Sequence, residues 1–120
     1  MALSVTVTDD RLEDVVIKET ALNNAGIENV TGASGRLYHF SADSADSSNA
    51  NHIKIYDQTT ATASTDPDII IPIPASGKAE MVCREGIPFT NGLSLRSSRE
   101  AGTSGTTDPG GNVTIYLVAN

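Results

Sequence analysis

The chain has 120 residues, of which 38% are hydrophobic and only 4% aromatic, and its formal net charge at pH 7 is −7. This length suits a single domain, and its core must consist mainly of Ile, Val, Leu and Ala because the chain has no Trp. The acidic balance argues against binding to nucleic acid or to an anionic membrane surface, and a single cysteine excludes an intrachain disulfide.

The N-terminal stretch contains one clear pattern and one ambiguous pattern. Residues 2–8 alternate between apolar and polar side chains, which predicts a short strand or an extended arm. Residues 12–26 fit a helix loosely and a strand equally well, so both structures stay open. Because residues 9–28 are acidic and weakly patterned, we expect residues 1–30 to form an N-terminal arm that packs on a partner. The alternative is that residues 2–8 are an edge strand of the main domain.

From residue 31 the alternation is steadier. It predicts short strands over residues 36–42, 52–57, 69–73, 78–83, 93–96 and 112–118. Turn-rich segments separate these strands, which is typical of an all-β fold. We therefore predict an antiparallel β-sandwich, or a jelly-roll-like domain, as a body over residues 31–120. Its interior is predicted to contain Ile53, Ile55, Ile71, Leu95 and Ile115.

Local signals refine this arrangement. Pro72 and Pro74 cannot donate backbone hydrogen bonds, so the strand over residues 69–73 should lie at a sheet edge. The Asn91-Gly92 pair favours a tight turn. Residues 99–111 are rich in Gly and Thr, which indicates a long flexible loop.

Several polar side chains could in principle hold a metal ion. One loop carries four of them: Asp43, Asp46, Asn49 and Asn51. A calcium loop needs oxygen ligands at alternate positions and a Gly at its sharp turn, and this loop has neither feature. His39 and His52 are expected on neighbouring strands, with polar contacts favoured over metal binding. The sequence therefore predicts no metal site.

Catalytic chemistry is also not indicated. Asp57, Asp66 and Asp68 have the side chains of a glycosidase pair, but no pattern predicts the apolar pocket that an acid–base pair needs, so we interpret them as turn caps. Cys83 is interpreted as a small buried residue at a strand end. No nucleophile elbow is present. We expect neither an enzyme nor a cofactor.

Three motifs in a fixed order carry a family resemblance: KIYD at Lys54–Asp57, PDIIIPIP at Pro67–Pro74, and GIPFTNGL at Gly86–Leu93. With these motifs the chain resembles, over roughly residues 31–118, a group of small structural proteins of tailed phages. That group consists of virion accessory proteins and includes capsid cement proteins of cyanophage-like viruses. The resemblance implies a capsid decoration protein that binds the major capsid protein on the outer surface of the head and stabilises the head.

This resemblance leads to expectations about assembly. Since no basic leader or apolar signal region begins the chain, we expect assembly in the host cytoplasm and a final location on the virion. We expect a homo-oligomer, with a trimer favoured. The residues expected to contact a partner are the apolar residues of the N-terminal segment: Leu3, Val5, Val7, Leu12, Val15, Val16 and Ile17.

A second function stays open at this point. The chain could be a carbohydrate- or receptor-binding β module of a head fibre or tail. Sugar sites favour exposed aromatic side chains, and the few aromatic residues here fall mostly in predicted strands. The decoration function is therefore favoured.

Overall fold

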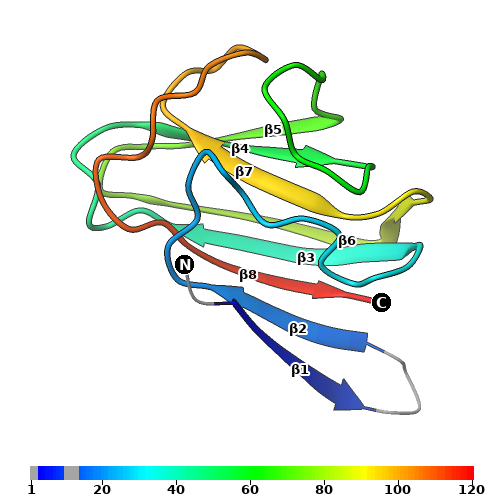
Figure 1. Cartoon of the computed structure of the whole chain (residues 1–120). Helices are drawn as coiled ribbons and strands as arrows, with labels where there is room; N and C mark the ends of the chain where they lie inside the picture. Colours follow the sequence, from blue (N-terminus) through cyan, green and yellow to red (C-terminus); the bar gives the residue numbers. More distant parts are fainter. Residues whose placement is uncertain (1–2, 10–13) are drawn as a thin grey trace.

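Eight β-strands form two antiparallel sheets in the computed structural model, which describes residues 3–9 and 14–120 (Figure 1). The larger sheet contains, in spatial order, β1 (Leu3–Asp9), β2 (Asp14–Glu19), β8 (Thr114–Ala119), β3 (Gly35–Asp43) and β6 (Lys78–Phe89). The smaller sheet contains β5 (Ile69–Ile73), β4 (Asn51–Tyr56) and β7 (Ser94–Ser98). The predicted all-β antiparallel sandwich is confirmed, whereas the jelly-roll-like arrangement stays a prediction. Among the described residues, no helix is long and apolar enough to span a membrane.

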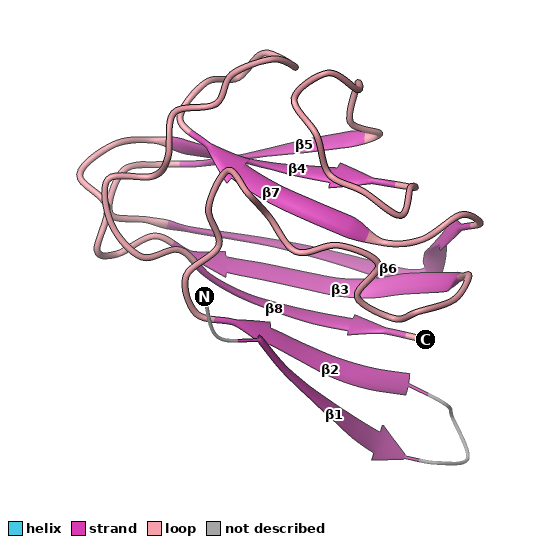
Figure 2. Ribbon diagram, in the orientation of Figure 1, coloured by secondary structure: helices cyan, strands magenta, loops and turns pink. Residues whose placement is uncertain are grey.

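The ambiguous N-terminal segment is a strand rather than a helix. β2 pairs with β1 on one side and with β8 on the other, and its three consecutive β-branched residues suit a pleated strand (Figure 2). β1 is the edge strand of the larger sheet, as the alternative interpretation of residues 2–8 proposed. The sheet therefore continues across the boundary that we expected near residue 30.

The core lies between the two sheets and contains residues from both. Four of the five predicted core residues are buried, and Ile71 is half-buried against the core from the edge strand β5. The location of β5 confirms the edge position predicted from its prolines. Residues 20–34 connect β2 to β3 within the larger sheet, and between these strands Ile27 forms an isolated bridge with Leu95 of β7 in the smaller sheet. This connection adds Leu22 and Ile27 to the core.

A bulge interrupts the larger sheet where β3 meets β6. Leu37 pairs with Ile87 but His39 pairs with Val82, so the register shifts between these two positions. Gly86 lies in the shifted stretch with φ 79°, and a Cβ there would come within 2.7 Å of the Arg36 and Tyr38 side chains. The bulge extends β6 well beyond the predicted residues 78–83 and breaks the simple alternation predicted for residues 36–42.

Candidate functional site

The outer face of the larger sheet carries a row of paired side chains. Lys18 pairs with Tyr116, Tyr116 with Ser41, and Ser41 with Glu80, so the row crosses four strands. Side chains of directly paired residues leave a sheet on the same face. Because Leu117, the next residue on β8, is fully buried in the core, the row faces away from the core.

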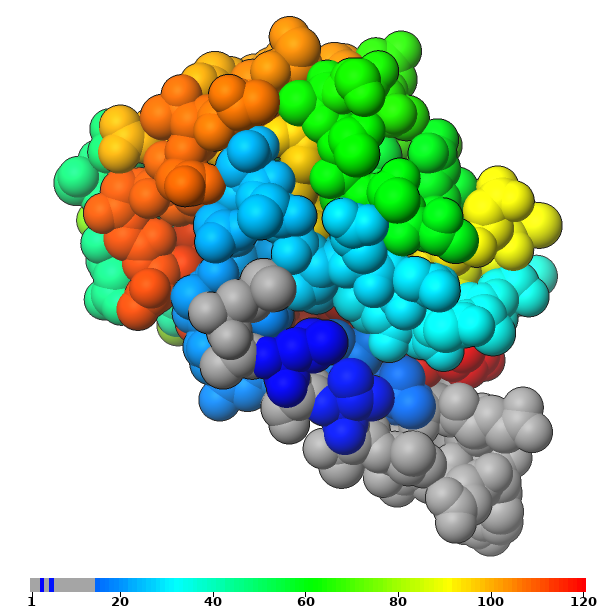
Figure 3. Space-filling view, viewed as in Figure 1, coloured from blue at the N-terminus to red at the C-terminus, as the bar shows by residue number. Residues whose placement is uncertain are grey.

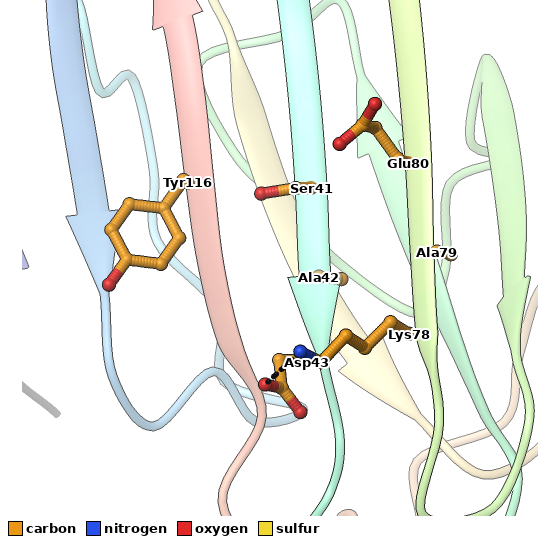
Figure 4. A pocket seen from close by; sticks show the side chains of 7 residues that line it. All are labelled: Ser41, Ala42, Asp43, Lys78, Ala79, Glu80 and Tyr116. Carbon is orange, nitrogen blue, oxygen red and sulfur yellow. Dashed lines mark ion pairs between the residues drawn. The ribbon is translucent and has the colours of Figure 1, made fainter.

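A hollow of about 400 Å³ lies over this row, on strands β8, β3 and β6. Figure 4 shows Ser41 between Tyr116 and Glu80, with Lys78 and Asp43 paired at one end of the hollow. The serine side chain is short and its two neighbours are long, so the row is low in the middle and high at both sides. The Tyr116 side of this hollow is solvent-accessible, with 41% of that residue exposed.

Charges of both signs surround the hollow. The Lys78 ammonium lies 3.8 Å from the Asp43 carboxylate, and His39 Nε2 lies 3.5 Å from Glu80 Oε2. The Lys18 ammonium lies 5.4 Å from the centre of the Tyr116 ring, which is a cation–π distance. The charges nearly balance, so the hollow is polar without a strong field of either sign.

The residues predicted to contact a partner fall into different environments. Ile17 is fully buried in the core and Val15 packs against the core, so the prediction of a partner contact at Ile17 is wrong. Val16 is half-buried and pairs with Val118. The backbone of Val7 pairs with that of Val15, and Leu12 lies outside the described residues.

Leu3 and Val5 remain exposed, at 47% and 50%. Val5 pairs directly with Ile17 and therefore projects from the same face of the sheet. That face is the core face, but β1 lies at the edge of the sheet farthest from the three-stranded sheet (Figure 2). The core face of β1 is therefore apolar and solvent-exposed.

The loop that was considered and rejected as a calcium site makes internal hydrogen bonds. Asp43 Oδ1 accepts a hydrogen bond from the Ala45 amide at 2.8 Å, and Asn51 Nδ2 donates to Ser47 Oγ at 3.1 Å. Within the part of the chain that the structure describes, no group of three or more His, Cys, Asp or Glu residues could hold a metal ion.

The aspartates interpreted as turn caps include two that hold backbone amides. Asp57 Oδ1 accepts hydrogen bonds from the amides of Thr90 and Asn91, each at 2.8 Å. The amide of Asp57 itself donates to Asp68 Oδ2 at 2.6 Å. Turn capping by Asp57 and Asp68 is therefore confirmed, and the three motifs of the family resemblance meet at Asp57.

The expectations for histidine and cysteine need correction. His39 lies on β3 and His52 on β4, and these strands belong to different sheets, so the two residues are not on neighbouring strands. His52 Nδ1 lies 2.9 Å from the Arg99 carbonyl oxygen. Cys83 is half-buried within β6 rather than fully buried at a strand end.

Two buried cations on the smaller sheet were missed by sequence reasoning. Lys54 and Arg96 alternate with core residues, which is the pattern of solvent-facing side chains, yet neither is exposed to solvent. Arg96 donates to the carbonyl oxygens of Thr103 and Gly105 at 2.5 and 2.7 Å, and Lys54 donates to the Gly102 carbonyl oxygen. These bonds hold the segment 99–111, which we expected to be flexible, over the outer face of the smaller sheet. Figure 3 shows this segment, in orange, packed against the body of the molecule.

Burial changes the acid–base properties of this cluster. Loss of hydration lowers the pKa of Lys54, the nearby Arg96 guanidinium lowers it further, and the Glu100 carboxylate acts in the opposite direction. Hydrogen bonds from Thr107 lower the pKa of Glu100. Both buried cations donate hydrogen bonds to carbonyl groups of the loop, and Arg96 also donates to Tyr56 Oη and Asn24 Oδ1.

Comparisons of this chain with protein-family models, with curated proteins and with solved structures found no match.

Proposed function

We propose that this chain is a structural protein of a phage virion, a capsid decoration protein that binds the major capsid protein on the outer surface of the head. The three sequence motifs support this function, since they occur in the order found in the phage group and converge on Asp57. Their role at that point is structural. They support the fold of the body, and a different surface docks to the capsid.

The observation that carries the proposal is the exposed core face of β1. Leu3 and Val5 are about half exposed although Ile17, which pairs with Val5, is fully buried. β1 is also the last strand of the sheet, so within the described residues no strand pairs with its outer edge. An edge strand with exposed apolar side chains is a common docking element, because it offers backbone hydrogen bonds and apolar surface together.

The negative charge of residues 1–30 adds specificity to this docking. Residues 1–30 contain more acidic than basic side chains, so basic patches on a capsid subunit would orient the encounter. We propose a trimer as the bound form. A trimer would present three β1 edges, one from each chain, to the symmetric capsid lattice at the same time. Weak single contacts would then give tight overall binding.

The test uses phage heads that lack the protein. The purified chain should co-sediment with these heads, raise the temperature at which they rupture, and appear as added density on the outer surface by cryo-electron microscopy. Val5→Asp should abolish binding and leave the melting temperature of the free protein nearly unchanged, because Val5 is half exposed.

The matched control is Val82→Asp, since Val82 is an exposed valine on β6 at the opposite edge of the same sheet. This variant should bind heads like the wild type. Added density at the neck or tail in place of the head, or equal loss of binding in both variants, would contradict the proposal. The mass of the free protein in solution tests the trimer separately.

The second candidate function is a carbohydrate-binding module of a head fibre or tail. The sequence argued against this function because its aromatic residues fall mostly in strands. Tyr116 lies in a strand but is exposed beside a polar hollow, and this observation favours the function. Density at a fibre or tail position in the particle would favour this function over decoration.

A further inference from the structure

We propose that the hollow around Ser41 binds a neutral sugar ring, which lies against Tyr116 and hydrogen-bonds to Glu80. This site does not depend on the docking of β1 to a capsid. The hollow lies on the outer face of the larger sheet, whereas Leu3 and Val5 project from its core face.

The size and shape of the hollow suit a small ring. Its volume of about 400 Å³ lies within the usual range for small-molecule sites. Ser41 forms the low centre, and Tyr116 and Glu80 are its direct partners on the two neighbouring strands (Figure 4). A ring that rests on Ser41 therefore has Tyr116 on one side and Glu80 on the other.

The side chains around the hollow match the chemistry of a sugar. A pyranose has apolar C–H faces and a rim of hydroxyl groups. The Tyr116 ring, which is 41% exposed and has the Lys18 ammonium 5.4 Å from its centre, supplies apolar surface, and the Glu80 carboxylate, 65% exposed, accepts hydrogen bonds from hydroxyl groups. Ser41 can donate and accept, and Lys78 at the end of the hollow can donate to ring or hydroxyl oxygens.

Other ligand classes fit less well. The hollow is lined by two carboxylates, Asp43 and Glu80, and by one ammonium group, Lys78, which already faces Asp43, so the lining gives a phosphate or another anion no net attraction. A lipid chain would leave these charged groups without hydrogen-bonding partners. Within the described residues no group of acidic and histidine side chains is suited to a metal ion.

The experiment is a titration of the isotope-labelled full chain, followed by the NMR signals of its backbone amides. The probes are the methyl glycosides of glucose, galactose, mannose and N-acetylglucosamine, together with maltotriose and triacetylchitotriose. At least one probe should give saturable shifts, at millimolar concentrations, that centre on Ser41, Glu80 and Tyr116. Tyr116→Ala should weaken that binding about tenfold or more, because the apolar surface for the ring is lost.

Further variants separate a sugar site from an incidental surface effect. Tyr116→Phe keeps the ring and should retain binding, whereas Ser41→Tyr should abolish it by filling the hollow. Val82→Ser, on the same face of β6, is the control and should bind like the wild type. Val5→Asp should also leave sugar binding unchanged, so that failure of capsid docking and failure of this site are distinguishable.

Three outcomes would overturn the inference. The first is the absence of saturable shifts with every probe. The second is a response centred elsewhere, or one that Tyr116→Ala leaves unchanged. The third is an equal or stronger response at the same residues to sodium phosphate, which would make the hollow an anion site.

Discussion

Asp57 closes the turn that contains Asn91, although 33 residues separate Asp57 from Thr90, the first residue of that turn to which it bonds. Asp57 Oδ1 accepts from the Asn91 amide at 2.8 Å, and the Asn91 side-chain amide donates back to the Asp57 carbonyl oxygen at 3.3 Å. One carboxylate thereby holds the end of β4 against the loop that leads into β7. This contact brings the KIYD and GIPFTNGL segments together in the folded chain.

We predict that Asp57→Ala lowers the free energy of unfolding by about 2 kcal/mol, because two backbone amides lose a charged acceptor. Asp57→Asn keeps one side-chain oxygen as an acceptor and should lose less of the free energy of unfolding. Asp66→Ala is the matched control, since Asp66 is exposed, and it should stay within about 0.5 kcal/mol of the wild type. Urea denaturation measures all three variants. Equal stability of Asp57→Ala and Asp66→Ala would refute the structural role.

A second prediction concerns Arg96 and the loop over the smaller sheet. Arg96→Leu removes the donors to Thr103 and Gly105, so the amides of Arg99 and Thr107 should exchange hydrogen about tenfold faster or more. Hydrogen exchange followed by NMR gives this rate for each amide.

The control for Arg96→Leu is Arg84→Leu, which removes an exposed arginine from β6 and should leave exchange in the loop unchanged. Exchange that stays slow in Arg96→Leu would mean that other contacts hold the loop.

A third prediction follows from the lowered pKa of Lys54, whose ordinary value is 10.5. Between the pKa in the folded chain and 10.5, the unfolded chain binds more protons at this residue than the folded chain does. The free energy of unfolding therefore rises with pH across this interval. Below the interval, protonated Lys54 carries its full cost of burial next to Arg96, and above 10.5 that cost is gone.

The comparison variant for this pH dependence is Lys54→Met, which keeps the length of the side chain and cannot titrate. The wild type should gain stability relative to Lys54→Met as the pH rises through the interval, in denaturation curves measured at several alkaline pH values. Tyrosines and the other lysines titrate in both proteins, so their contributions to the pH dependence cancel in the difference. Parallel curves would show that Lys54 has an ordinary pKa.

A fourth prediction separates the edge strand from the core. A chain without residues 1–13 loses β1 but keeps Ile17, Leu22 and Ile27, so it should remain folded and melt cooperatively. A chain without residues 1–28 also loses these three buried side chains and the strand next to β8, and it should not fold. Circular dichroism during heating distinguishes the two. A folded chain without residues 1–28 would show that the N-terminal segment is dispensable for the body.

The strands themselves were predictable from sequence because alternation is a local property. Ile53 and Ile55 lie two residues apart, and successive side chains of a strand point to opposite faces whatever the rest of the chain does. The edge position of β5 followed from a proline in the same way, since a missing amide donor is a property of the residue itself. The segment over residues 12–26 stayed ambiguous, because its β-branched residues form a strand only when β1 and β8 pair on either side.

The candidate sites depended on contacts between distant segments, and only the tertiary structure decided them. Val5 and Ile17 project from the same face of one sheet, but one is half exposed and the other fully buried, because the core packs against β2 and leaves β1 uncovered. Lys54 has the pattern of a solvent-facing residue and is buried by a loop that follows about 50 residues later. Tyr116, Ser41 and Glu80 form one row only because β8, β3 and β6 pair side by side, and this pairing is set by how the whole core packs.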